Sequence, residues 1–189
     1  MINKKEILTS SNLLSTFRLF LAVPFWFLLN YFDNSTVRYY AFGLALFASF
    51  TDIMDGFLAR KLNQVTEFGK IIDPLADKVC VGVIIIKLFL IGEISTFYFL
   101  LIVLRDLIIF TGGVIISKKI GKVLPSNALG KITVIIIGIV ILLIFINVER
   151  NNLLFKSFYY SSILLSIASL IGYALRASEF LKHNKYESV

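Results

Sequence analysis

Charged residues are scarce in this sequence, and cysteine and histidine occur only once each. Asp, Glu, Lys and Arg together make up 16% of the 189 residues, whereas soluble domains contain about 25%. The single cysteine, Cys80, excludes an internal disulfide, so cysteine usage does not reveal the redox compartment. The sequence shows no internal repeat and no low-complexity tract, and we therefore expect residues 1–189 to form one domain.

Hydrophobic residues are abundant instead. They account for 58% of the chain, the mean hydropathy is +0.85, and they fall in long runs, which is typical of a membrane domain. Each run is near the ~20 residues that a helix needs to cross ~30 Å of hydrocarbon. Because backbone groups in lipid must bond internally, the runs should be helices. We therefore predict an all-α integral membrane protein with six transmembrane helices, at Leu13–Phe32, Val37–Leu58, Ile71–Ile91, Phe97–Ser117, Ala128–Ile146 and Leu153–Leu175.

The distribution of Lys and Arg between these segments predicts the orientation. Most basic residues fall on the side that holds both termini, so both termini should be cytoplasmic. The net charge of +7 is thus explained by topology, and we expect no nucleic-acid partner. The stretch "INKKEILTSS" is expected to form a short interfacial helix. A cleaved signal peptide is disfavoured, because the first apolar run is long, contains Arg18 and lacks a small-residue cleavage site.

Four aspartates interrupt this apolar pattern within "TDIMDGFLARKLNQVTEFGKIIDPLADK". Asp52 and Asp55 lie near the cytoplasmic end of the second segment, and Asp73 and Asp77 near the start of the third. Spacings of three and four place each pair on one helix face, and a short connection makes the two helices antiparallel neighbours. Four close carboxylates repel one another, so some are protonated or a cation lies among them. Oxygen ligands favour Mg²⁺, Mn²⁺ or Ca²⁺, and two such ions can promote displacement at phosphorus.

Small residues and one arginine accompany the aspartates. Gly56, Ala59 and Gly69 would allow close approach of a helix or a ligand, and Arg60 would provide a phosphate-binding fork. The structural alternative is that the aspartates only cap the helix ends in water. Ionisable groups within membrane segments cost free energy and usually have a function, which favours a functional site.

These residues carry a family resemblance. The pattern Asp52-x2-Asp55-Gly56-x2-Ala59-Arg60-x8-Gly69-x3-Asp73-x3-Asp77 resembles the signature of the CDP-alcohol phosphotransferases at every specified position. The resemblance covers nearly the whole chain. It implies a membrane enzyme that transfers a substituted phosphate from a CDP-linked donor to an alcohol and releases CMP. It implies two divalent ions, Mg²⁺ or Mn²⁺, held by Asp52, Asp55, Asp73 and Asp77, with Asp77 also the general base. The implied CDP-binding residues are Asp52, Gly56, Ala59, Arg60, Gly69 and Asp73.

The acceptor alcohol is less clearly indicated. The stretch "SNLLSTFRLFLAVP" resembles phosphatidylglycerophosphate synthases, which use glycerol 3-phosphate, although Ser15 replaces their usual Thr. The Arg105-Asp106 pair instead resembles CMP-forming cardiolipin synthases, whose acceptor is phosphatidylglycerol; inositol phosphate and serine are further alternatives. A phosphorylated acceptor needs cations, and Arg18, Arg105 and Lys131 are the candidates. The structural alternatives are snorkelling for Arg18 and Lys131 and an ion pair with Asp106 for Arg105.

Two rival classes remain open. A six-span transporter would place acids near mid-membrane and often has repeated halves, and a non-catalytic membrane scaffold would not require four aspartates. We favour the enzyme, with CDP-diacylglycerol, the acceptor and the lipid bilayer as partners. Family resemblance also implies a homodimer. The expected location is the cell (inner) membrane, with the active site facing the cytoplasm.

Overall fold

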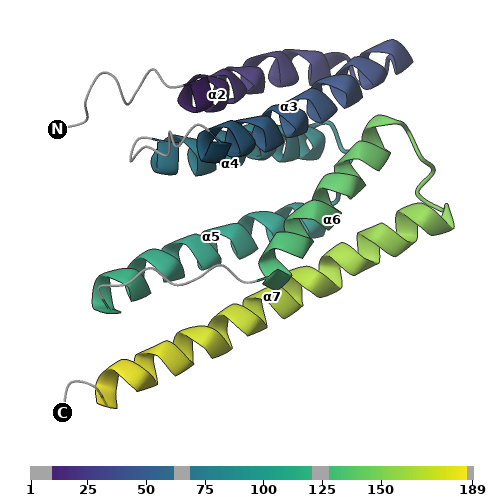
Figure 1. The fold of residues 1–189 in the computed structure, drawn as a ribbon. Coiled ribbons are helices and arrows are strands. Elements are labelled where there is room, and N and C mark those ends of the chain that lie inside the picture. The colour runs from purple at the N-terminus through teal and green to yellow at the C-terminus, as the bar shows by residue number, and fades with distance from the viewer. Residues whose placement is uncertain (1–9, 62–68, 121–127, 187–189) are drawn as a thin grey trace. The chain divides into compact units, whose positions relative to one another are not determined.

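The computed structural model describes residues 10–61, 69–120 and 128–186. Every regular element in these ranges is helical, and they contain no strand. The chain divides into two compact units, Met1–Glu93 and Ile94–Val189, which are described separately below. The elements shown in Figure 1 are α2 (Ser10–Leu28), η1 (Leu29–Tyr31), α3 (Ser35–Lys61), α4 (Gly69–Leu90), α5 (Thr96–Ile120), α6 (Ala128–Phe145) and α7 (Leu153–Tyr186).

The helical character of all six predicted segments is confirmed. Four helical stretches of the described residues are long and apolar enough to cross a membrane: Asn12–Tyr31, which includes η1, Thr96–Ile116, Ala128–Phe145 and Leu153–Phe180. The helices α3 and α4 are not among these four, and they carry the aspartates that lower their apolar character. The count of six crossings and the orientation therefore stay predictions. The expected interfacial helix falls largely on residues 1–9, outside the described residues.

The outward surface of these helices is apolar. Large side chains such as Phe20 (65% exposed), Ile115 (66%), Ile135 (62%) and Leu164 (69%) face away from the protein interior. In water this pattern would expose far more hydrophobic surface than a soluble monomer tolerates. In a bilayer the same side chains contact lipid, which agrees with an integral membrane protein.

In the first unit, α2 packs against both α3 and α4 (Figure 1). Phe25 and Leu29, at the end of α2 and in η1, are fully buried, as are Ala41 of α3 and Ala76 of α4. Because alanine has a small side chain, it allows neighbouring helices to approach closely. The packing therefore positions α2 against the two helices that bear the aspartates.

In the second unit, α7 packs against both α5 and α6. A buried hydrogen bond of 2.8 Å joins the Tyr98 hydroxyl of α5 to Ser162 Oγ of α7. Further along, Gly112 of α5 allows the ring of Tyr173 to lie close, because a Cβ at Gly112 would be 3.0 Å from Tyr173 Cε1. Small and hydroxyl residues thus hold α5 against α7, as is common between membrane helices.

Two helices end with a residue in the left-handed region. Gly92 (φ +79°) follows α4, and its N–H donates to Phe89 O while the Glu93 N–H donates to Leu88 O. Asn147 (φ 57°) ends α6 with the same pair of hydrogen bonds. This arrangement satisfies carbonyls that a helix end leaves unpaired. The polar breaks "GEIS" and "NVERNN" therefore stop helices for a local reason.

Candidate active site

Two of the four aspartates meet at the ends of α3 and α4. Asp52 lies two turns from the end of α3, and Asp77 lies two turns from the start of α4. Both carboxylates accept a hydrogen bond from the same atom, Nη1 of Arg18, and the distance to Asp52 Oδ1 is 2.7 Å. The prediction that carboxylates of these two helices face each other is confirmed for this pair.

Arg18 is the cation between them. It lies in α2, its side chain is only 3% exposed, and its carboxylate partners Asp52 and Asp77 are 50% and 45% exposed. A buried guanidinium requires compensation by negative charge, and the two aspartates provide it from two different helices. Because Asp52 and Asp77 are half exposed, they stay accessible to a ligand.

A third aspartate, Asp73, lies one turn before Asp77 on α4. Its Oδ1 atom is buried and has no hydrogen-bond partner among the residues that the structure describes. A buried carboxylate oxygen without a partner is costly, so this atom suits a ligand such as a cation.

Other predicted site residues are described only through their backbone. Asp55, Ala59 and Arg60 continue α3, and Gly69 begins α4, but their side chains lie outside the described residues. Gly56 follows Asp55 directly and is half-buried.

The donor set fits hard divalent cations in type. Asp52, Asp73 and Asp77 offer only carboxylate oxygens, the ligands that Mg²⁺ and Mn²⁺ prefer. Among the described side chains, no three acidic, His or Cys residues are grouped closely enough to hold one ion. The predicted set, however, includes Asp55, whose side chain is not described.

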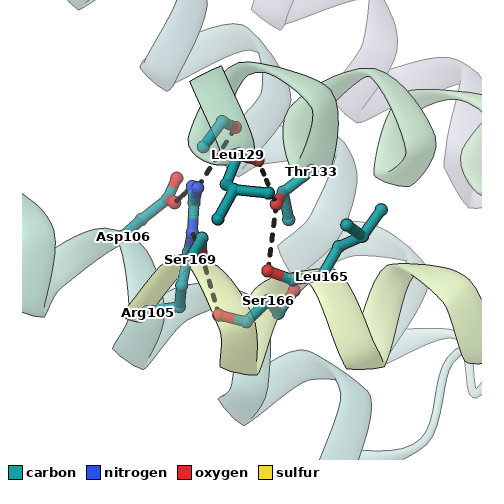
Figure 2. Close-up of polar contacts among 8 residues, drawn as sticks. Arg105, Asp106, Leu129, Thr133, Leu165, Ser166 and Ser169 are labelled. Atoms are coloured by element: carbon teal, nitrogen blue, oxygen red, sulfur yellow. Dashed lines mark hydrogen bonds and ion pairs between the residues drawn. The ribbon is translucent and has the colours of Figure 1, made fainter. Parts of the chain in front are cut away.

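A second polar cluster lies within the other unit, around Arg105 of α5 (Figure 2). Its Nη1 donates to Asp106 Oδ1 at 2.6 Å and its Nη2 to the carbonyl of Gly130 at 3.2 Å. Its Nε donates to Ser169 Oγ at 3.1 Å. The expected pairing with Asp106 is therefore present, and α6 and α7 add two further acceptors. Lys131, the third predicted acceptor contact, follows Gly130 on α6 and is exposed.

The sequence pattern of the CDP-alcohol phosphatidyltransferases matches residues 8–174, and so covers both clusters. The chain belongs to the CDP-alcohol phosphatidyltransferase family. Within this family, the acidic residues around Arg18 are therefore the candidate reaction centre.

Similar proteins come from several bacteria, and the three compared below are each named CDP-diacylglycerol–glycerol-3-phosphate 3-phosphatidyltransferase. The Aquifex aeolicus protein is 32% identical over 90% of this chain and 96% of its own length. The Bacillus subtilis protein is 38% identical over 64% of this chain and 63% of its own. The Rickettsia typhi protein is 40% identical over 47% of this chain, and the match spans only half of that relative's length.

Sequence reasoning missed four contacts in this member of the family. Arg18 was assigned to the acceptor, and the structure engages it with Asp52 and Asp77. Ser169 and the Gly130 carbonyl were not recognised as partners of Arg105. The available signal was that a cation inside an apolar span requires polar partners at the same depth.

Proposed function

We propose that this CDP-alcohol phosphatidyltransferase transfers the phosphatidyl group of CDP-diacylglycerol to glycerol 3-phosphate and releases CMP. The observation that carries the proposal is the convergence of Asp52 and Asp77 on one buried guanidinium, within the pattern of the family. The acceptor is supported by the names of the Aquifex aeolicus and Bacillus subtilis relatives.

The acidic residues are proposed to hold two divalent cations, Mg²⁺ or Mn²⁺. Asp52, Asp55, Asp73 and Asp77 would be the ligands, and the buried Asp73 Oδ1 supports this assignment. When bound, such cations neutralise the pyrophosphate and make CMP a better leaving group. The residues proposed to contact the CDP part are Asp52, Gly56, Ala59, Arg60, Gly69 and Asp73.

Asp77 is proposed to be the general base. As the acceptor oxygen forms its bond to phosphorus, the bond between that phosphorus and the CMP oxygen breaks. The proton of the acceptor hydroxyl then moves to the Asp77 carboxylate. The 45% exposure of this side chain supports access by a substrate.

Arg105 and Lys131, together with Arg18, are proposed to bind the phosphate of the acceptor. A guanidinium has five N–H donors, and Arg105 directs one at each of its three partners among the described residues. Two donors remain, one on each terminal nitrogen, and guanidinium N–H groups are well suited to binding phosphate oxygens.

The membrane arrangement is part of the same proposal. We infer six crossings, cytoplasmic termini and a location in the cell membrane, because basic residues gather on one side of the apolar segments. A short interfacial helix before α2 and a homodimer complete the proposal.

The cytoplasmic location of the C-terminus can be tested with fusion proteins. A fluorescent protein fused to the C-terminus should fluoresce in the cytoplasm, and an alkaline phosphatase fused there should be inactive.

The decisive experiment measures CMP release by purified protein in detergent. With CDP-diacylglycerol, Mn²⁺ and glycerol 3-phosphate, we expect the wild type to release CMP. Addition of a chelator should abolish this release, and the Asp77→Asn variant should release no CMP. The matched control is Asp33→Asn, an exposed aspartate outside both clusters, which should keep wild-type activity. CMP released without any acceptor, or released by Asp77→Asn at the wild-type rate, would contradict the assigned roles.

One alternative acceptor is favoured by a specific feature. The Arg105-Asp106 dipeptide resembles the cardiolipin synthase branch, and its two side chains form an ion pair of 2.6 Å. Phosphatidylglycerol should therefore replace glycerol 3-phosphate in a parallel assay, with inositol phosphate and serine as further acceptors. The acceptor that gives the highest rate of CMP release identifies the branch.

A further inference from the structure

The orientation of the Arg105 guanidinium is fixed by all three helices of its unit. Asp106 belongs to α5, Gly130 to α6 and Ser169 to α7, and each accepts from a different nitrogen of Arg105 (Figure 2). A long side chain held at three points has little rotational freedom left. The direction of its two remaining N–H groups is therefore determined by these partners.

The Ser169 hydroxyl makes two hydrogen bonds. Its hydroxyl donates to the Ser166 carbonyl at 2.9 Å, which leaves its oxygen lone pairs for the Arg105 Nε–H at 3.1 Å. The side chain is completely buried. A hydroxyl can both donate to the carbonyl and accept from the guanidinium, and alanine can do neither.

Gly130 acts on the opposite end of the guanidinium. Its carbonyl accepts from Nη2, and a Cβ added at this position would lie 3.2 Å from the same nitrogen. That distance is tighter than ordinary van der Waals contact, so alanine would shift the guanidinium by a few tenths of an ångström. The absence of a side chain at Gly130 thus leaves space for this orientation of Arg105.

We infer that Ser169 and Gly130 are positioning residues, which aim the two remaining Arg105 donors at the phosphate of the acceptor. This inference rests on the proposed function, in which Arg105 binds that phosphate. Neither residue is assigned a contact with substrate. Their effect is on acceptor recognition, because misalignment weakens both hydrogen bonds to the phosphate at once.

The chain contains a matched control for each residue. Ser166 lies on the same helix as Ser169 and is equally buried, but its hydroxyl has no hydrogen-bond partner among the described residues. Gly138 lies on the same helix as Gly130, and a Cβ there would meet nothing within 4 Å. The variants Ser166→Ala and Gly138→Ala therefore change the same atoms without affecting Arg105.

The experiment compares KM values for the two substrates by CMP release in detergent. Ser169→Ala and Gly130→Ala should each raise the KM for glycerol 3-phosphate by about fivefold to tenfold, as expected for one weakened hydrogen bond to a charged group. The KM for CDP-diacylglycerol should stay within about twofold, and both control variants should resemble the wild type. Ser169→Thr, which keeps the hydroxyl, should restore much of the acceptor affinity.

The outcomes separate this inference from the proposed function. If the wild type releases no CMP with glycerol 3-phosphate, the proposed function fails, and the inference fails with it. If the wild type is active but Ser169→Ala has the same acceptor KM as Ser166→Ala, only the inference fails. It also fails if the KM values for both substrates rise together with a lower melting temperature, because the serine would then be purely structural.

Discussion

Replacement of Arg18 by glutamine tests the central contact of the acidic cluster. Arg18→Gln keeps most of the side-chain volume and removes the charge that Asp52 and Asp77 share. Two carboxylates would then face each other without a cation. In the presence of a chelator, we expect the Arg18→Gln variant to be less stable than the wild type. Divalent cations should restore the stability of the variant, because they replace the lost positive charge.

The magnitude follows from the burial of the three groups. Breaking a fully buried ion pair costs about 3–5 kcal/mol, whereas an exposed pair contributes about 0–1 kcal/mol. Arg18 is 3% exposed but its partners are about half exposed, at 50% and 45%. An intermediate loss of about 2 kcal/mol is therefore expected, which lowers the melting temperature by about 4–8 °C for a chain of this size.

The assay is thermal unfolding of purified protein in detergent, first with a chelator and then with Mn²⁺. The control is Arg38→Gln, which breaks a 2.8 Å ion pair with Glu93 far from the aspartates in sequence. Mn²⁺ should raise the melting temperature of Arg18→Gln more than that of the wild type or of Arg38→Gln. Equal increments in all three proteins would refute the reasoning, as would an Arg18→Gln variant that is as stable as the wild type in chelator.

Two further predictions concern the second unit, and both are measured by thermal unfolding. Tyr98→Phe should cost less than about 1 kcal/mol, because Ser162 Oγ still donates to a carbonyl of the preceding turn. Ser162→Ala should cost about 1–2 kcal/mol, because it leaves the buried Tyr98 hydroxyl without a partner, and the reverse order would contradict this. Gly112→Ala should cost about 1–2 kcal/mol by pressing on the Tyr173 ring, whereas Gly138→Ala, which meets nothing, should be neutral; equal effects would show that the ring moves freely.

Much of the fold could be predicted from the apolar runs and the polar breaks between them. The predicted segment Leu153–Leu175 correctly indicated a helix, but α7 continues to Tyr186. Hydropathy marks where a segment becomes less apolar, and the residues after Leu175 include charged residues and good helix formers such as Arg176, Ala177 and Glu179. The prediction for residues 37–58 and 71–91 was correct for helices, whereas membrane crossing by α3 and α4 stays a prediction.

The candidate site was predictable where spacing along one helix decides it. The intervals between the aspartates predicted one acidic face on each helix, and the short connection predicted that the two helices are neighbours. The shared contact of Asp52 and Asp77 with Arg18 confirms that these two carboxylates meet. The partners of Arg18 lie 34 and 59 residues away in sequence, and those of Arg105 on α6 and α7 lie 25 and 64 residues away. Such distant pairings depend on how helices pack, and periodicity within a segment carries no information about that.

The three hydrogen bonds of the Arg105 guanidinium also have a consequence for membrane insertion. When α5 leaves the ribosome, its Arg105 has its neighbour Asp106 as a partner, whereas α6 and α7, which carry Gly130 and Ser169, have not yet packed against it. A charged group with so little compensation is costly in lipid. The helix α5 is therefore expected to become more stable in the bilayer when α6 and α7 arrive with the other two acceptors of Arg105.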